Sequence, residues 1–199
     1  MSVIWNRLRY VLGPQFDVYE KIAPVVRGRV ADIGFGTGFG THLLTIYAKE
    51  VCGYETDEDA IRFAQRVFPF KKLRFEYGDI GKGIKAMAPF DYIVMIDVLE
   101  HIKQDKDAML NVKAMMAKGG TFICSTPNRL SRYRKSDNHY REYAPKELEG
   151  VLKRVFVSVS LRDYKLEPLV SQYENPLIAV CRNEETVTQS VKGEEHGRP

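Results

Sequence analysis

The segment from Val30 to Gly40, V-A-D-I-G-F-G-T-G-F-G, constrains the fold of this chain more than any other. Three apolar residues and one acid, Asp32, form a run typical of a buried strand, and four glycines follow at alternate positions. Glycine permits positive φ angles and lets a ligand approach the backbone with no Cβ in the way. The apolar spacing of residues 41–49 predicts a helix next. A strand, a glycine turn and a helix in this order present free N–H groups to a ligand.

The spacing of these glycines argues against the common dinucleotide-binding turn. The G-x-G-x-x-G fingerprint needs its third glycine three residues after the second. Counted from Gly34 and Gly36, that position holds Phe39. The pattern present is G-x-G-x-G, completed by Gly38, with an acid two residues before the first glycine. A nicotinamide cofactor is therefore disfavoured.

Strand and helix patterns alternate along the rest of the chain. We expect strands at residues 50–55, 72–77, 90–96 and 121–125, and helices at residues 58–68, 105–117 and 146–155. Asp57 is the expected N-cap of the first of these helices. The alternation predicts an α/β fold with a doubly wound, mostly parallel sheet and right-handed crossovers. Two later strand-like runs, 156–164 and 173–182, lie close in sequence and predict an antiparallel edge hairpin.

Length and composition indicate one domain. A chain of 199 residues can bury a single substantial core. We expect this domain at residues 1–182, with residues 1–27 as two short helices that cover the sheet or form a lid, and residues 183–199 as a disordered tail. In the lid, Trp5, Tyr10 or Tyr19 would meet the ligand. No run approaches the ~20 apolar residues of a membrane span, and no signal peptide is evident. We expect a cytoplasmic protein, and its oligomeric state is not predicted.

Polar side chains stand at the expected carboxyl ends of the strands, where ligands bind in open α/β sheets. They are Asp32, Glu55, Asp79, Asp97 with Glu100 and His101, and Asn128. Glu55 could accept both hydroxyls of a ribose, because a carboxylate offers two acceptor oxygens. Asp79 could accept a hydrogen bond from an adenine amino group, with Ile80 against the ring. The alternatives are a solvated acid at a helix start for Glu55 and a turn-forming role for Asp79.

Five segments in order resemble the class I S-adenosylmethionine-dependent methyltransferases over residues 28–128. They read A-D-I-G-F-G-T-G, V-C-G-Y-E-T-D, Y-G-D-I, F-D-Y-I-V-M-I-D-V-L-E-H-I and K-G-G-T-F-I-C-S-T-P-N. V-L-E-H-I and S-T-P-N are similar to the branch with the ubiquinone-pathway O-methyltransferases and small methyltransferases of sugar and natural-product pathways. The resemblance implies a Rossmann-like seven-stranded sheet, S-adenosyl-L-methionine as cofactor and S-adenosyl-L-homocysteine as product. It implies cofactor contacts from Asp32, Gly34, Phe35, Gly36, Gly38, Glu55, Thr56, Asp79, Ile80 and Asp97.

The candidate catalytic residues are Asp97, Glu100 and His101 in D-V-L-E-H, together with His139. The first three share one face if their turn is helical. The set resembles the E-x-x-E-H plus distal histidine of methyltransferases that use a divalent ion, with Asp97 one methylene shorter than the usual glutamate. Three interpretations stay open: the four residues bind a Mg²⁺-like ion, His101 alone is a general base, or Glu100 and His101 only cap a helix and hold a loop.

The sequence constrains the methyl acceptor less than it constrains the cofactor. Residues 129–141 carry five basic residues and one acid, which fits a clamp for an anionic acceptor or a mobile surface loop. Tyr133 and Tyr140 could stack on bases, but a net charge of +4 without a broad basic face makes nucleic acid an unlikely partner. The segment N-H-Y-R-E-Y-A-P-K-E-L resembles small methyltransferases of glycan pathways and favours a saccharide.

The sequence thus predicts methyl transfer to an oxygen, in preference to a nitrogen, of a small anionic or saccharide-type acceptor. The alternatives are a cofactor-binding regulatory module without turnover and a methyltransferase acting on RNA-end ribose.

Overall fold

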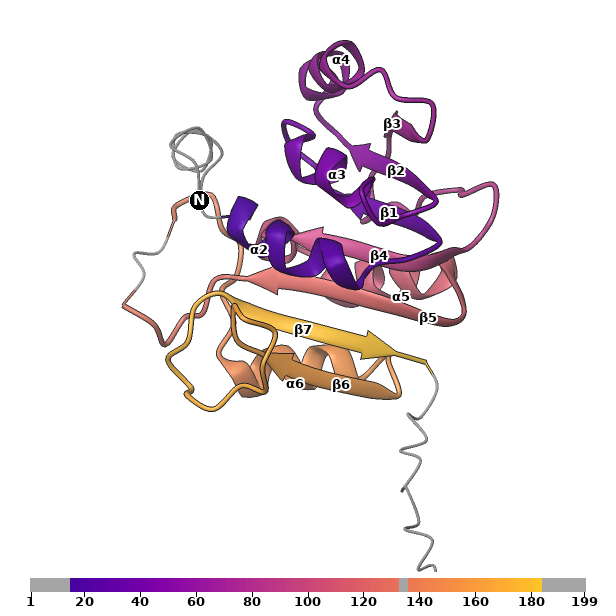
Figure 1. The fold of residues 1–199 in the computed structure, drawn as a ribbon. Coiled ribbons are helices and arrows are strands. Elements are labelled where there is room, and N and C mark those ends of the chain that lie inside the picture. The colour runs from indigo at the N-terminus through magenta and orange to yellow at the C-terminus, as the bar shows by residue number, and fades with distance from the viewer. Residues whose placement is uncertain (1–14, 133–135, 184–199) are drawn as a thin grey trace, which may run out of the picture.

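A single seven-stranded sheet forms the centre of the molecule in the computed structural model, which describes residues 15–132 and 136–183 (Figure 1). The strands are β1 Arg29–Ile33, β2 Glu50–Glu55, β3 Leu73–Tyr77, β4 Phe90–Ile96, β5 Met116–Thr126, β6 Ser158–Arg162 and β7 Leu177–Arg182. Their order in the sheet is β3-β2-β1-β4-β5-β7-β6. The first five are parallel, while β7 pairs antiparallel with both β5 and β6. The predicted doubly wound sheet with an antiparallel edge hairpin is confirmed.

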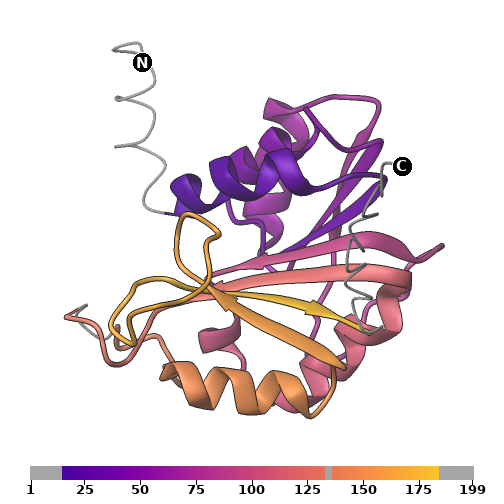
Figure 2. The ribbon, with the colours of Figure 1, turned by 60° about the horizontal axis from the view of Figure 1, so that its bottom comes forward.

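Helices cover both faces of this sheet (Figure 2). The helices are α2 Gln15–Ile22, η1 Ala23–Val25, α3 Phe39–Leu44, α4 Glu58–Val67, η2 Leu99–His101, α5 Asp105–Met115 and α6 Pro145–Lys153. Successive strand residues point to opposite faces, so the core has two parts. Val30 packs with α2, α3 and α4 on one face, whereas Ala31 and Ile33 pack with α5 and α6 on the other.

The predicted element bounds hold closely on the parallel side of the sheet. The strands at 50–55 and 90–96 begin and end where predicted, and Asp57 caps α4 by accepting hydrogen bonds from the amides of Asp59 and Ala60. The helix predicted at 41–49 is shorter and ends at Leu44. There the hydroxyl of Thr45 donates to the carbonyl of His42, and the amide of Lys49 already donates to the carbonyl of Gly28, just before β1.

The largest difference between the predicted and the observed elements lies at the start of the fifth strand. The sequence predicted a helix to residue 117 and a strand from 121, but α5 ends at Met115 and β5 runs continuously from Met116. Gly119 has a φ of +72°, and the register with β4 shifts in this region. Glycine adopts this left-handed conformation without strain. Gly119 and Gly120, which were predicted to end a helix, therefore form a bulge inside a strand.

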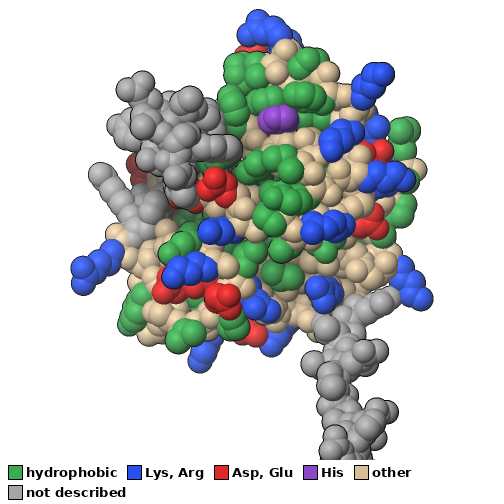
Figure 3. Space-filling view, viewed as in Figure 1, with side chains coloured by type: hydrophobic (Ala, Val, Ile, Leu, Met, Phe, Trp, Pro, Cys, Tyr) green, Lys and Arg blue, Asp and Glu red, His purple; other side chains and the backbone are tan. Residues whose placement is uncertain are grey.

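Some predictions fall on residues outside the described ranges. These are the first lid helix with Trp5 and Tyr10, Tyr133 of the basic loop, and the tail at 184–199. On the face drawn in Figure 3, hydrophobic side chains gather over α3 and α4. In the described part of the chain, no helix has both the length and the apolar character needed to cross a membrane.

Strand order reverses between β1 and β4, which pair with each other although β2 and β3 lie between them in the sequence. Crevices for ligands form at the carboxyl ends of the strands beside such a reversal. The residues that follow β1 and β4 are the glycine turn and Asp97. The topology therefore places these two segments at the expected binding crevice.

Candidate functional site

Three glycines of the turn after β1 have positive φ angles, +72° at Gly34, +56° at Gly36 and +82° at Gly38. A Cβ at Gly34 would lie 2.4 Å from Val98, so close packing requires this glycine. A Cβ at Gly36 would meet nothing within 4 Å. The backbone of Gly36 therefore borders open space, as a turn that receives a ligand requires.

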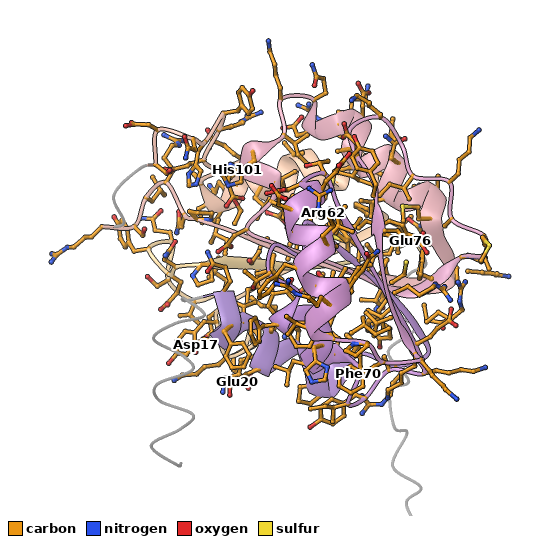
Figure 4. All side chains as sticks on the ribbon, turned by 90° about the horizontal axis from the view of Figure 1, so that it is seen from above. Asp17, Glu20, Arg62, Phe70, Glu76 and His101 are labelled. Atoms are coloured by element: carbon orange, nitrogen blue, oxygen red, sulfur yellow. The ribbon has the colours of Figure 1, made fainter. Side chains whose placement is uncertain are left out.

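Two cavities meet at this turn. The larger, about 590 Å³, extends from Gly34 past the ends of β2 and β3 to η2. The smaller, about 290 Å³, lies between α2 and the glycine turn. Gly34 and Asp97 line both cavities. Together they form one elongated crevice with a junction at Asp97. In Figure 4, His101 lies on one side of the molecule and Asp17 and Glu20 of α2 lie on the other.

Glu55 closes the larger cavity from the end of β2. One carboxylate oxygen, Oε2, accepts a hydrogen bond from the amide of Gly36 at 3.1 Å. The other, Oε1, accepts from the amide of Thr56 at 2.7 Å and from that of Asp57 at 3.2 Å. These bonds fix the carboxylate beside the glycine turn. A carboxylate retains free lone pairs after such contacts and can accept the hydroxyls of a ribose.

Asp79 and Ile80 lie deeper in the same cavity, after β3. The Asp79 carboxylate accepts a bond from the amide of Gly81 at 2.9 Å and pairs with Lys82 at 3.1 Å. Partial burial raises the pKa of Asp79, but the bonds from Lys82 and Gly81 outweigh it, so the pKa lies below its usual value. Asp79 is therefore an anion beside the buried Ile80, and it can accept a hydrogen bond from an amino group on a ring that lies against Ile80.

Two other acids lie at or beside the crevice: Asp97 lines both cavities and is half-buried, whereas Asp32 is fully buried and lines neither. Burial raises the pKa of Asp32 to about 7, although the hydroxyls of Thr41 and Tyr19 lower it. Burial also raises the pKa of Asp97, against the hydrogen bonds of Ser125 and Gln15 and the charges of His101 and His139. No lysine or arginine in the described ranges forms an ion pair with either acid. Such a pair of carboxylates favours a cationic ligand.

The predicted catalytic set is brought together in part. Ligand atoms of Glu100, His101 and His139 lie within 4.8 Å of one another, and Asp97 is not a member of this group. The turn after β4 is a single 3₁₀ turn that begins at Leu99, so Asp97 precedes it instead of sharing a helical face. Asp97 instead accepts a hydrogen bond from Ser125 at 2.6 Å.

Hydrogen bonds orient both histidine rings. Nδ1 of His101 lies 3.0 Å from the carbonyl oxygen of Asn138, and Nδ1 of His139 lies 2.8 Å from the carboxylate of Glu142. Both partners are acceptors, so each Nδ1 carries the proton and donates. In the described residues, Nε2 of each ring is left without a hydrogen-bond partner. Each Nε2 can therefore take up a proton or bind a metal ion.

Glu100 is fully buried beside these rings. Its Oε2 accepts a bond from the hydroxyl of Thr126 at 2.9 Å, whereas its Oε1 has no partner in the described part of the chain. Burial, followed by the charge of Asp97, raises the pKa of Glu100 to about 8. An unpartnered buried oxygen near two free Nε2 atoms fits a divalent cation, because metal ligands in proteins combine imidazole and carboxylate in this way.

The loop that carries His139 is held against η2 by the backbone. The carbonyl of Glu100 accepts the amide of Tyr140 at 2.9 Å, and the amide of Arg141 at 3.3 Å. Sequence reasoning missed Glu142, which is buried and orients His139. Its spacing of three residues from His139 was the available signal, but an acid in a loop rich in charges gave no reason to single it out.

Asn128 and two arginines of the predicted basic loop form contacts within the protein. Asn128 is buried, and its amide group donates to the carbonyls of Gln172 and Glu174, so it anchors the segment before β7. In the basic loop, Arg129 pairs with Glu147 and Arg141 with Asp105. Two of the five predicted basic residues are therefore already paired, which leaves less positive charge for an anionic acceptor.

The family model for a methyltransferase domain matches residues 6–163. The chain belongs to the methyltransferase-domain family. A protein of Mycolicibacterium smegmatis, named as a probable S-adenosylmethionine-dependent methyltransferase, is 27% identical over 134 residues, or 67% of this chain and 51% of that protein. A ubiquinone biosynthesis O-methyltransferase of Maricaulis maris is 28% identical over 107 residues, or 52% of this chain and 42% of that protein. This methyltransferase-domain chain spans about half the length of the curated relatives it matches.

A solved structure has the same fold. The TehB-like S-adenosylmethionine-dependent methyltransferase of Corynebacterium glutamicum has a TM-score of 0.69 and 22% identity, covering 90% of this chain and 94% of that one. At this identity the likeness concerns the fold alone. The family match and the named relatives confirm the predicted S-adenosylmethionine-dependent methyltransferase family, and the solved structure confirms its class I fold.

The crevice of this methyltransferase domain fits that cofactor on its own chemistry. S-adenosylmethionine is a nucleoside with a sulfonium and an ammonium group, so it needs acceptors for a ribose and for positive charge. Glu55 offers the ribose acceptor, and the half-buried Asp97, which lines both cavities, offers a carboxylate with no lysine or arginine partner among the described residues. The fully buried Asp32 lies beside the crevice and lines neither cavity. The open space at Gly36 leaves room for the part of the cofactor that joins its ribose to its charged groups.

Proposed function

We propose that this chain transfers the methyl group of S-adenosylmethionine to an oxygen of a small, saccharide-type acceptor. The observation that supports an oxygen is the oriented His101, which lines the larger cavity with its Nε2 free. A hydroxyl must lose its proton when it is methylated, whereas a neutral amine can attack with its lone pair. A site with a base or a metal ion beside the donor is therefore expected for a hydroxyl acceptor.

In this proposal the adenosine end of the cofactor lies in the larger cavity against Glu55, Asp79 and Ile80. The methionine end lies in the smaller cavity under α2, with the glycine turn between. Asp97, at the junction, faces the reacting part of the cofactor. Methyl transfer is an in-line displacement, so alignment of the acceptor oxygen with the sulfonium accounts for much of the rate.

The acceptor hydroxyl lies beside His101 in this arrangement. Asn138 holds the proton on Nδ1 of His101, so Nε2 can accept the proton of the hydroxyl. A divalent ion, if Glu100, His101 and His139 hold one, would lower the pKa of the hydroxyl. Two imidazoles and one carboxylate suit Zn²⁺, Mn²⁺ or Fe²⁺ better than the Mg²⁺-like ion expected from the sequence, because Mg²⁺ prefers oxygen ligands.

Calorimetry with S-adenosylhomocysteine and NAD tests the cofactor, and a screen of sugars, nucleotide sugars, phenols and RNA ends with labelled donor tests the acceptor. We expect tight S-adenosylhomocysteine binding, no NAD binding, and label transferred to a saccharide hydroxyl. Binding of the cofactor with no turnover on any class would favour the regulatory module. Transfer to RNA ends alone would contradict the small-molecule acceptor.

A further inference from the structure

Three segments lie together at the amino ends of β1, β2 and β3, the edge of the sheet opposite the crevice. They are residues 24–28, 45–49 and 68–72. Hydrogen bonds join them, because the amide of Lys49 donates to the carbonyl of Gly28 at 2.8 Å and the side chain of Lys72 donates to the carbonyl of Thr45. These three segments form one continuous surface, which we call the amino-edge surface.

Each segment of the amino-edge surface exposes apolar side chains to solvent. The exposed fractions are 43% for Val25, 64% for Ile46, 43% for Tyr47 and 47% for Phe70. The Phe70 ring stacks on His42 of α3, with 4.7 Å between the ring centroids, so it is held at the surface. Figure 3 shows hydrophobic side chains over α3 and α4 with Lys and Arg side chains beside them. Apolar side chains exposed together in this way indicate a contact surface.

Positive charge without negative charge accompanies these apolar side chains. The three segments contain no aspartate or glutamate. Their cations are Arg27, Lys49, Lys71 and Lys72. Arg27 lies over the ring of Tyr47, 5.7 Å from its centroid, and none of the four cations forms an ion pair with a described residue. Glu50, the acid that follows the second segment, already pairs with Arg29 of β1.

This combination fits an anionic lipid surface better than a protein or a nucleic acid. Interfaces between proteins are depleted in lysine, whereas three of the four cations here are lysines. A second copy of this chain docked through the same surface would bring like charges together. Interfaces with nucleic acid are polar and offer no apolar environment to Ile46. At a membrane, apolar and aromatic side chains enter the headgroup boundary while lysine and arginine meet anionic headgroups.

We propose that the amino-edge surface binds this chain peripherally to membranes that contain anionic lipids, with Ile46, Tyr47 and Phe70 entering the headgroup region. This inference goes beyond the proposed function and does not depend on it. Phe70 precedes β3 and His101 follows β4, and Figure 4 shows these two residues on opposite sides of the molecule. A chain bound in this way keeps the crevice toward the aqueous phase, where a small polar acceptor reaches it.

Co-sedimentation of the full chain with vesicles tests the proposal. Vesicles of equal parts phosphatidylcholine and phosphatidylglycerol would be compared with vesicles of phosphatidylcholine alone. We expect binding to the anionic vesicles that weakens as salt is added, and binding to the neutral vesicles that is at least about tenfold weaker. Absence of binding to the anionic vesicles overturns the inference, and so does equal binding to both.

Two double variants locate the contact. Ile46→Ser with Phe70→Ser removes apolar contacts, and Lys49→Gln with Lys71→Gln removes charge alone. Each should weaken binding to the anionic vesicles roughly tenfold or more and leave the Tm unchanged. Wild-type vesicle binding in either variant overturns the inference. The lysine variant alters only exposed side chains, so it decides the matter even if the apolar variant fails to fold.

The matched controls lie away from the amino-edge surface. Val170→Ser with Tyr173→Ser, at side chains 95% and 62% exposed between β6 and β7, is the apolar control. Lys103→Gln with Lys106→Gln, at the start of α5, is the charge control. Both should bind anionic vesicles as wild type does, and a comparable loss in either overturns the inference. A dimer in sedimentation velocity that the apolar variant abolishes, or duplex DNA bound more tightly than anionic vesicles, overturns it in favour of a second copy or of nucleic acid.

Discussion

Ser125 and Asp97 are joined across the ends of β5 and β4 by a hydrogen bond of 2.6 Å from the Ser125 hydroxyl to Oδ1 of Asp97. The amide of Asp97 in turn donates to both the carbonyl and the hydroxyl oxygen of Ser125, at 3.1 Å each. These bonds hold Asp97 at a φ of +52°, a left-handed conformation that few residues other than glycine adopt. Strain held by several bonds is common at functional sites, and here it fixes the carboxylate at the junction of the two cavities.

Asp97→Asn should separate the charge of this residue from its conformation. Asparagine tolerates the left-handed region, so we expect little change in Tm. The affinity for S-adenosylhomocysteine should fall about tenfold or more, because the half-buried carboxylate proposed to face the cation is replaced by a neutral amide. Calorimetry and a thermal melt measure the two quantities. Asp163→Asn, on the loop after β6, is the control, and an unchanged affinity in Asp97→Asn would contradict the placement of the cofactor.

Glu100→Gln should make the free protein more stable at neutral pH. The pKa of Glu100 is raised to about 8 in the folded protein. Between the unfolded pKa, about 4.3, and about 8 the folded state holds a proton that the unfolded state has lost, so stability falls as pH rises through this window. Glutamine does not titrate, so the variant does not lose this stability as the pH rises.

Thermal melts from about pH 5 to about pH 8 measure the effect. The Tm of Glu100→Gln should exceed that of wild type increasingly toward the upper end, by roughly 2–4 °C for each kcal/mol gained. Methyl transfer should fall in the same variant. Glu149→Gln, on the exposed face of α6, is the control. A variant less stable than wild type at every pH would show that the Glu100 carboxylate stabilises the free fold.

Metal dependence distinguishes the two catalytic interpretations of Glu100, His101 and His139. If they bind a divalent ion, wild-type protein should bind Zn²⁺ or Mn²⁺ in calorimetry, and His139→Ala should lose this binding. Glu142→Gln should weaken it roughly tenfold to 100-fold, since second-shell carboxylates orient histidine ligands. Full turnover after chelation would exclude the metal and leave His101 as the base. In that case His101→Ala should still abolish turnover.

The arrangement of the residues proposed to hold the cofactor could be predicted because it depends on local sequence. Asp32 is the last residue but one of its strand, Glu55 ends its strand and Asp97 follows one, and parallel strands bring their ends to one edge. The glycine turn needs no distant partner to be identified. The bulge at Gly119 was missed because a glycine pair after a helix equally indicates a C-cap.

The acceptor half could not be predicted in the same way, because it depends on a long loop folding back. His139 reaches His101 only because the carbonyl of Glu100 accepts two amides of this loop. Nothing in the order of residues indicates that Glu142, rather than another acid of the loop, meets His139. The pairing of Arg129 with Glu147 across 18 positions is equally non-local.

Cofactor binding should strengthen as pH rises through about 7. Burial raises the pKa of Asp32 to about 7 in the free protein, so below that pH the carboxyl is mostly protonated. If the ammonium group lies near Asp32, as the cofactor placement proposed above implies, it favours the charged carboxylate, and binding at low pH must therefore release a proton. The Kd for S-adenosylhomocysteine should fall up to about tenfold per pH unit below pH 7 and level off above it. Calorimetry in two buffers of different ionisation enthalpy from about pH 5 to about pH 8 measures the affinity and the proton release together. Asp32→Asn should flatten this profile, whereas Asp97→Asn should keep the midpoint. A wild-type affinity that falls with rising pH would show that Asp32 does not meet the cation.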